Sequence, residues 1–293
     1  MKKNHMQNAL LEETMIKKLL LSATLAYTAN AVEVTKVWES ESVLKVPESV
    51  LLDKKNDRLF VANINGKPTD KDGNGFISIL NLDGTIKELK FSEGMDAPKG
   101  MAVFENKLYV SDIDKLRVID LNSGKIQKSY YVKEAKFLND VAVTKDGTVY
   151  VSDFSPANKA IYKLENDQLL KWMGSGNLLD QRPNGLWVED DSLIIGTKGG
   201  FIFKAKLDSK RLDTFTKDIG TNGIDGILPF DEKSYISSDW AGRVFISTKD
   251  NSTKIIDGTD KKINAADIWY DKESKMLYIP TFFDNRILGY KIK

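Results

Sequence analysis

The fold of this chain is decided by the stretch PKGMAVFENKLYVSD, residues 98–112, whose two apolar runs recur along the sequence. The first run has the counterparts PESVLL, LNDVAV, PNGLWV, IDGILP and AADIWY, which begin at residues 47, 138, 183, 224 and 265. The second run returns in segments such as RLFVAN and TVYVSD, at residues 58 and 148. The period is about forty residues with several short strands per unit, which is the signature of a β-propeller blade.

Six such units predict an all-β protein: a six-bladed β-propeller with four-stranded antiparallel blades, forming a single domain over residues 32–293. Each unit contains a third run rich in Val, Ile, Tyr and Phe and bounded by turn residues. Five units have a fourth candidate strand, but the last unit stops after its third. The segment VEVTKVW, residues 32–38, is the expected donor of the missing outer strand. This exchange would join the two ends of the domain and close the ring.

The composition excludes several function classes. The chain carries 43 Lys and Arg residues against 42 Asp and Glu, so it has no basic surplus for binding nucleic acid. It has no cysteine, which excludes disulfides and a thiol nucleophile. Its single histidine, His5, lies outside the repeats, so the propeller cannot build a Ser-His-Asp triad or a histidine-ligated zinc site. Any chemistry is therefore expected to use oxygen ligands and an oxygen-ligated metal.

The N-terminal segment has the order of a secretory signal peptide. From Met15 it reads MIKKLLLSATLAYTANA, with two lysines, a short apolar stretch and small residues up to Ala31. We expect residues 1–31 to be a signal peptide, with Met15 as the true start, cleavage after Ala31 and a periplasmic or secreted mature protein. The alternative is an amphipathic N-terminal helix of a cytosolic protein. The apolar stretch is too short for a permanent membrane anchor.

One position of the repeat points to a metal site. It holds four oxygen-donor side chains, and the complete series is Glu48, Lys99, Asn139, Asn184, Asp225 and Ala266. The innermost strand of each blade starts at one face of the ring, so these residues are expected around the mouth of the central tunnel. Calcium prefers carboxylate and amide oxygens, which makes it the expected cofactor, with zinc or magnesium as alternatives. The competing explanation is that Asn and Asp are common in turns before strands.

The PESV, PKG, ND, PNG and DG openings, with LYVSD-type second strands, resemble the gluconolactonase and regucalcin family of six-bladed propellers, also known as the senescence-marker-protein and luciferin-regenerating-enzyme group. The resemblance covers about residues 32–293. It implies that a divalent cation is bound by four residues, called the quartet: Glu48, Asn139, Asn184 and Asp225. It also implies a hydrolase that acts on a lactone or an ester.

Three residues are candidates for catalysis in such a hydrolase. The cation would polarise the carbonyl or activate a water, and Asp225 would accept the proton of that water. Asp140 would be a second base or would orient the ligands. Lys99 would stabilise an oxyanion. The other explanation for Lys99 is a solvated lysine at the tunnel rim or a counter-charge to Glu48.

Polar residues at the ends of the second strands form a second tier that should surround the metal. They are Asn63, Asp112, Asp153, Thr197, Asp239 and Thr281, and turn capping is the competing explanation for each. Trp240 follows Asp239 and is the tryptophan expected to contact a substrate. The longer loop of residues 63–76 is expected to overhang the mouth as a lid.

Two function classes remain open from the sequence. The first is an exported, metal-dependent hydrolase acting on a small lactone or ester. The second is a non-catalytic periplasmic propeller that holds a small ligand or a protein partner, with a structural calcium. Propellers host both classes, so the fold does not choose between them.

Overall fold

The repeated runs form strands that pair in sequence order within each blade. The structure is a computed structural model and describes residues 32–178 and 180–293, so the predicted signal peptide, residues 1–31, lies outside the described residues. Blades 1 to 3 contain β2 (Pro47–Asp53), β3 (Arg58–Asn63), β4 (Gly75–Asn81) and β5 (Ile86–Met95); β6 (Pro98–Phe104), β7 (Lys107–Asp112), β8 (Lys115–Asp120) and β9 (Ile126–Tyr131); β10 (Leu138–Val143), β11 (Val149–Asp153), β12 (Ala160–Glu165) and β13 (Gln168–Met173). Blades 4 to 6 contain β14 (Pro183–Glu189), β15 (Ser192–Thr197), β16 (Ile202–Lys206) and β17 (Leu212–Thr216); β18 (Ile227–Pro229), β19 (Tyr235–Asp239), β20 (Arg243–Ser247) and β21 (Ser252–Asp257); β22 (Trp269–Asp271), β23 (Met276–Pro280), β24 (Ile287–Ile292) and β1 (Val34–Glu39).

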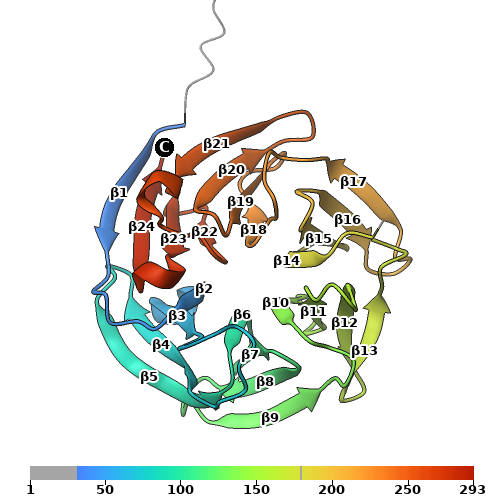
Figure 1. Ribbon diagram of the computed structural model, residues 1–293, viewed down its shortest axis with the longest axis horizontal. Coiled ribbons are helices and arrows are strands. Elements are labelled where there is room, and N and C mark those ends of the chain that lie inside the picture. The colour runs from blue at the N-terminus through green and yellow to red at the C-terminus, as the bar shows by residue number, and fades with distance from the viewer. Residues whose placement is uncertain (1–31, 179) are drawn as a thin grey trace, which may run out of the picture. The chain divides into compact units, whose positions relative to one another are not determined.

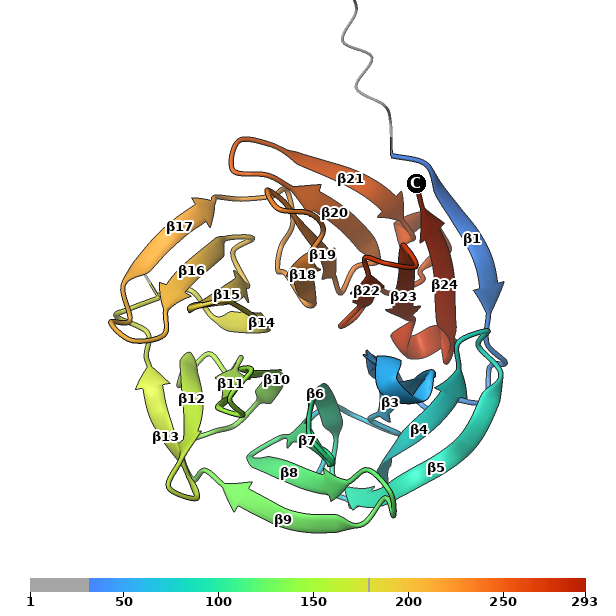
Figure 2. The ribbon, with the colours of Figure 1, turned by 180° about the vertical axis from the view of Figure 1, so that it is seen from behind.

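The six sheets confirm the predicted propeller. Each sheet has four antiparallel strands, and residues Val34–Lys293 form one compact unit. Figure 1 shows the sheets arranged in a ring, with β2, β6, β10, β14, β18 and β22 innermost. The same ring is seen from behind in Figure 2. Because every inner strand starts a blade, residues at these starts can meet at one face.

The last blade confirms the predicted ring closure. The N-terminal strand β1 pairs antiparallel with β24, from Val34 opposite Ile292 to Glu39 opposite Leu288. The inner strands are also joined across this seam, because the Asp267 amide donates to the carbonyl oxygen of Glu48 at 2.9 Å. The seam between the first and last blades is therefore closed both at the rim and near the axis.

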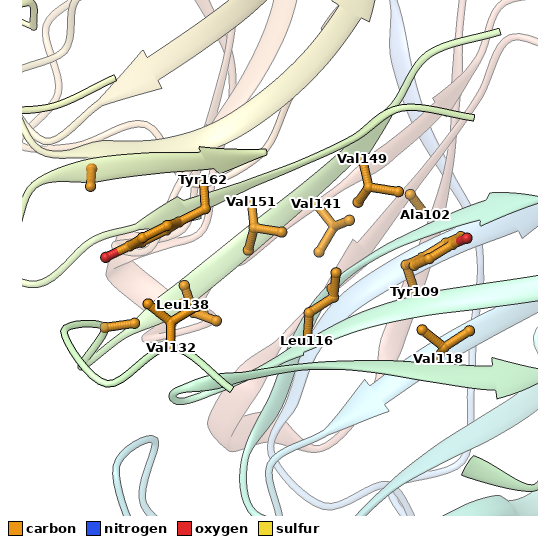
Figure 3. Packing of buried hydrophobic residues seen from close by; sticks show 12 residues of the cluster. Ala102, Tyr109, Leu116, Val118, Val132, Leu138, Val141, Val149, Val151 and Tyr162 are labelled. Carbon is orange, nitrogen blue, oxygen red and sulfur yellow. The ribbon is translucent and has the colours of Figure 1, made fainter. Parts of the chain in front are cut away.

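Apolar side chains fill the space between neighbouring blades. Figure 3 shows one such cluster, in which Tyr109 and Val118 from blade 2 lie beside Val141, Val149 and Val151 from blade 3. The β-branched residues suit a pleated sheet packed on both faces. Burial of each such side chain stabilises the fold by about 1.5–3 kcal/mol, and a chain of contacts of this kind holds the blades in register.

Helical structure is minimal in the described part of the chain. It comprises three short 3-10 turns, Lys54–Asn56, Thr259–Lys261 and Phe282–Asp284. Within residues 32–178 and 180–293, no helix has the length and apolar character needed to span a membrane.

Candidate functional site

The starts of the inner strands border one cavity at the mouth of the ring. The cavity has a volume of about 470 Å³. Its lining includes five of the six residues at the repeated position: Glu48, Lys99, Asn139, Asn184 and Asp225. The sixth, Ala266, is buried in an apolar cluster with Ile64 and Phe282. The fold thus gathers the quartet and Lys99 around one space, and their role as metal ligands stays a prediction.

A β-bulge interrupts four inner strands at the repeated position. In β6, the register shifts between Pro98 and Met101, so this strand carries one more residue than its partner β7. The same interruption occurs at residues 47–49, 138–141 and 183–186. A bulge bends its strand and re-aims a side chain, and bulges are common beside functional sites. The bulges therefore explain why these side chains turn from blade packing towards the cavity.

Glycines after the repeated position let neighbouring inner strands approach closely. A Cβ atom on Gly185 would lie 2.4 Å from the backbone oxygen of Asp225, and one on Gly226 would lie 2.6 Å from Oδ1 of Asp267. Real Cβ contacts essentially never fall below 3.0 Å, so these positions need glycine. The close approach brings Asn184, the residue before Gly185, beside Asp225.

Two oxygen atoms of the quartet, Oε2 of Glu48 and Oδ1 of Asn184, are buried and have no hydrogen-bond partner among the described residues. In contrast, Nδ2 of Asn184 donates to Oδ1 of Asp225 at 2.9 Å. Buried polar atoms are normally hydrogen-bonded, and an exception needs an ion, a water or a functional reason. A hard cation would satisfy both oxygens, so the residues present fit calcium.

The quartet differs from a carboxylate-rich metal site. Across residues 32–178 and 180–293, no group of three or more His, Cys, Asp or Glu side chains is placed to hold a metal ion. The quartet contains only two carboxylates, Glu48 and Asp225. The amide oxygens of Asn139 and Asn184 would therefore have to complete the ligand set.

The two carboxyl groups of the quartet have raised pKa values. Burial raises the pKa of Glu48 well above its usual range, and the charge of Asp225 adds to this effect while that of Lys99 opposes it. Burial raises the pKa of Asp225 to about 7, against the hydrogen bond from Asn184. In both cases the cause is loss of water around the charged form. A bound cation would reverse this effect, because it favours the ionised carboxylates.

Lys99 is a buried residue of the site. It is only 1% exposed, which excludes the solvated alternative. Its Nζ donates to the carbonyl oxygen of Ala97 at 2.9 Å and lies 4.7 Å from the centre of the Phe137 ring. Burial lowers its pKa, while the negative charges of Glu48 and Asp112 raise it. The Lys99 ammonium is thus held by the carbonyl oxygen of Ala97, and it interacts electrostatically with the carboxylate of Glu48.

Asp140 is not in the lining of the mouth cavity. It lines a second cavity, of about 240 Å³, which lies further along the inner strands and also contains Asp267. Its carboxylate accepts backbone N–H groups of Leu186 at 2.5 Å and Val141 at 2.6 Å. Burial raises the pKa of Asp140 to about 7 despite these bonds. The placement suits a residue that fixes β14, which carries Asn184, better than a base at the mouth.

Three second-tier residues bond to the loop before the inner strand of their own blade. Asp112 accepts the backbone N–H of Ala97 at 2.7 Å, and Asp153 accepts that of Phe137 at 3.1 Å. Asn63 makes the equivalent bond in blade 1. All three side chains are fully buried, and none lines the mouth cavity. Turn capping, the competing explanation, accounts for these contacts.

Asp239 and Trp240 do line the cavity. Asp239 accepts the Thr221 hydroxyl at 2.6 Å and pairs with Arg243 at 2.5 Å. Trp240 is 48% exposed, which is unusual for so large an apolar side chain. Trp240 thus lies at the cavity and is open to solvent, and its contact with a substrate stays a prediction.

The expected lid, residues 63–76, borders the mouth through Ile64 and Pro68, which both line the cavity. An ion pair between Lys71 and Asp114 joins this loop to blade 2. Lys71 is about half exposed whereas Asp114 is buried. The loop is therefore pinned at its far side, and it shapes one wall of the cavity.

The repeated polar positions do not identify several residues that line the mouth cavity. These are Phe137, Phe154, Lys198, Thr221, Asn222, Arg243, Phe282 and Phe283. A signal was present for some of them, because Phe154, Lys198 and Phe282 directly follow second-tier residues in the sequence. The position directly after the second strand could therefore have been used to predict residues that line the mouth cavity.

Comparisons with known proteins support the fold but not a family. The solved structure titled "Streptogramin B lyase structure" aligns with a TM-score of 0.64 at 12% identity, over 89% of this chain and 98% of that one. In all, 1385 chains of solved structures match, so the architecture is too widespread to choose a function. No family model matches the chain, and no curated protein matches its sequence. The chain is thus similar in fold to a propeller lyase, and membership of the gluconolactonase and regucalcin family stays a prediction.

Proposed function

We propose that this chain is a metal-dependent hydrolase that opens a lactone or an ester at the mouth cavity. The observation that carries the proposal is the pair of buried oxygens on Glu48 and Asn184 that lack a hydrogen-bond partner in the described part of the chain. The quartet would hold the divalent cation, with calcium as the first choice and zinc or magnesium as alternatives. When bound, this cation would supply the Lewis acidity that polarises a carbonyl group.

The chain's own residues supply the remaining chemistry. With the cation bound, the Asp225 carboxyl is held ionised and would accept the proton of the attacking water. Lys99 has three N–H donors and gives one to Ala97, so it keeps donors for a developing oxyanion. Asp140 would act as a positioning residue, through its bond to the backbone of Leu186 beside Asn184.

Calorimetry and turnover on the same protein test the proposal. We expect calcium to bind the parent protein, and Asp225→Ala and Asn184→Ala to lose that binding while keeping the fold, because the blade cores are untouched. Asp250→Ala, at an exposed aspartate, is the matched control and should bind normally. Full calcium affinity in both site variants refutes the ligand assignment. Metal-dependent hydrolysis of a lactone and ester panel, lost in the two site variants, supports the hydrolase.

A second function is favoured by the contacts of Lys99. Its buried ammonium already acts on the charge of Glu48, so Lys99 can serve as a counter-charge without a catalytic role. In that case the chain is a binding propeller for a small ligand or a protein partner, with calcium as a structural ion. Calcium binding without turnover across the panel would select this alternative.

We also propose that residues 1–31 direct export and are removed. The support is the order of lysines, apolar stretch and small residues before Val32. N-terminal sequencing of protein recovered from the periplasm or the medium should begin at Val32. Recovery of the full chain from the cytosol would contradict export.

A further inference from the structure

We propose that the mouth cavity selects cyclic carbonyl compounds that carry an aromatic ring. The inference deepens the proposed function by naming the class of ligand, and it rests on that function only for the later bond cleavage. Its basis is a wall of apolar and aromatic side chains, called the aromatic rim, made of Phe137, Phe154, Trp240, Phe282 and Phe283. All five line the same cavity as the quartet.

Three residues of the rim, Phe154, Trp240 and Phe282, occupy the same position of the repeat. The residue directly after each second-tier position lines the cavity in five of the six blades: Ile64, Phe154, Lys198, Trp240 and Phe282. Second strands end at the face where the inner strands begin, so these residues line the same cavity as the quartet. The fold therefore places mostly apolar side chains around the polar side chains of the quartet, which is the arrangement expected for a small-molecule site.

Trp240 and Phe283 are the open part of the rim. They are 48% and 63% exposed, whereas Phe282, between them, is only 5% exposed. Their ring centres are 6.0 Å apart and the rings are nearly perpendicular. Phe282 contacts both rings edge-on, at 5.7 Å from Trp240 and 4.9 Å from Phe283. Two large apolar rings held open to solvent beside a polar floor mark a ligand contact.

The turn that presents these rings is held in an unfavourable conformation. Phe282 has a φ of 54°, a left-handed value that a bulky residue rarely adopts. Hydrogen bonds between Thr281 and the backbone of Arg286, each 2.9 Å long, hold the turn. Across the loop, Asn264 Nδ2 donates to the carbonyl oxygen of Trp240 at 2.7 Å. Such a conformation persists only where the surrounding structure fixes the residue.

On the blade 3 side of the rim, cations already lie against the aromatic rings. The Lys99 ammonium lies 4.7 Å from the ring centre of Phe137, and the Arg182 guanidinium lies 4.6 Å from that of Phe154. Trp240 and Phe283 lack such a cation among the ring contacts of the described residues. An aromatic ligand would therefore stack at Trp240 and Phe283, with its carbonyl directed to the quartet and Lys99.

Matched lactams test this selection without relying on turnover, because their amide bond resists cleavage. The pair is 3,4-dihydro-2-quinolone, which has a fused benzene ring, and 2-piperidone, which has the same six-membered lactam alone. We expect the calcium-loaded protein to bind the aromatic lactam at least about tenfold more tightly, since ring stacking and burial add to the shared amide contacts. Trp240→Ala and Phe283→Ala should each remove most of this preference.

Tyr131→Ala is the control, because Tyr131 is 62% exposed and does not line the cavity. It should leave the preference unchanged. Equal binding of the two lactams, binding of neither, or a preference that survives in both rim variants would overturn the inference. Hydrolysis of the matching lactones, dihydrocoumarin and δ-valerolactone, is measured separately. An aromatic preference in lactam binding without any lactone turnover would uphold the selection and reject the hydrolase.

Discussion

Replacing Gly185 with Ala should separate the two quartet residues that lie in contact. The new Cβ atom would lie 2.4 Å from the backbone oxygen of Asp225, where ordinary contacts begin at 3.4 Å. The strands must therefore move apart by about 1 Å at this point, the difference between these two distances. Ile227, at 3.2 Å from the same Cβ, limits any sideways escape.

The magnitude follows from this displacement. Overpacking of a close contact costs about 1–3 kcal/mol of stability. The same movement would stretch the 2.9 Å bond from Asn184 to Asp225 and misplace both oxygens, which should weaken calcium binding by about 10–100-fold. Gly185→Ala should therefore reduce stability and affinity together, although it removes no ligand atom.

Gly176→Ala is the matched control. No heavy atom of residues 32–178 and 180–293 lies within 4 Å of a Cβ placed there, so stability should stay equal or rise by about 0.4–1 kcal/mol. Urea unfolding followed by tryptophan fluorescence gives the stability, and calorimetry gives the calcium affinity. If Gly185→Ala matches Gly176→Ala in both measurements, the close approach of β14 and the segment before β18 does not position the site, and the reasoning fails.

Three further substitutions test other parts of the fold. Asp112→Ala should cost about 3–5 kcal/mol in urea unfolding, because it leaves the buried N–H groups of Asp96 and Ala97 unpaired and takes from Arg117 its partner at 2.8 Å, so that only Asp96, at 3.8 Å, remains. A loss below about 1 kcal/mol would contradict this. Lys71→Ala should change stability by less than about 1 kcal/mol, since Lys71 is half exposed. Hydrogen exchange of residues 64–74 should nevertheless become faster, because the ion pair with Asp114 is lost. Unchanged exchange would show that this ion pair does not hold the loop. Trp38→Ala should cost about 3 kcal/mol, because the indole fills the space over two glycines beside the closing strand; a thermal midpoint equal to that of the parent would contradict this packing.

The fold could be predicted because the sequence of each blade repeats the same pattern of apolar strands and turn residues. PKGMAV and LNDVAV differ in residue type but keep their apolar positions, and the pattern fixes both the number of blades and the missing outer strand. The same alignment also gathered Glu48 and Asp225, which are far apart in the sequence. A repeat therefore carries three-dimensional information that a single segment does not.

Side-chain direction could not be predicted from the repeat. Asn139 lines the mouth cavity, while Asp140, the next residue, lines the second cavity, which lies further along the inner strands. Successive residues of a strand point to opposite sides, and a bulge shifts this alternation by one residue. The bulge at residues 138–141 is visible only in the strand register. The polar character of a residue alone thus could not predict which of the two cavities it lines.

The ring closure makes the mouth a late product of synthesis. Glu48 belongs to the first blade, whereas Phe282 and Phe283 belong to the last, and the bond from Asp267 to Glu48 joins them. A ribosome releases the first blade long before the last, so a partly made chain can form blade cores but not this cavity. Ligand binding at the mouth cavity would consequently require that β24 and the rest of the last blade have been made and folded. Chains truncated before the last blade would not bind the ligand.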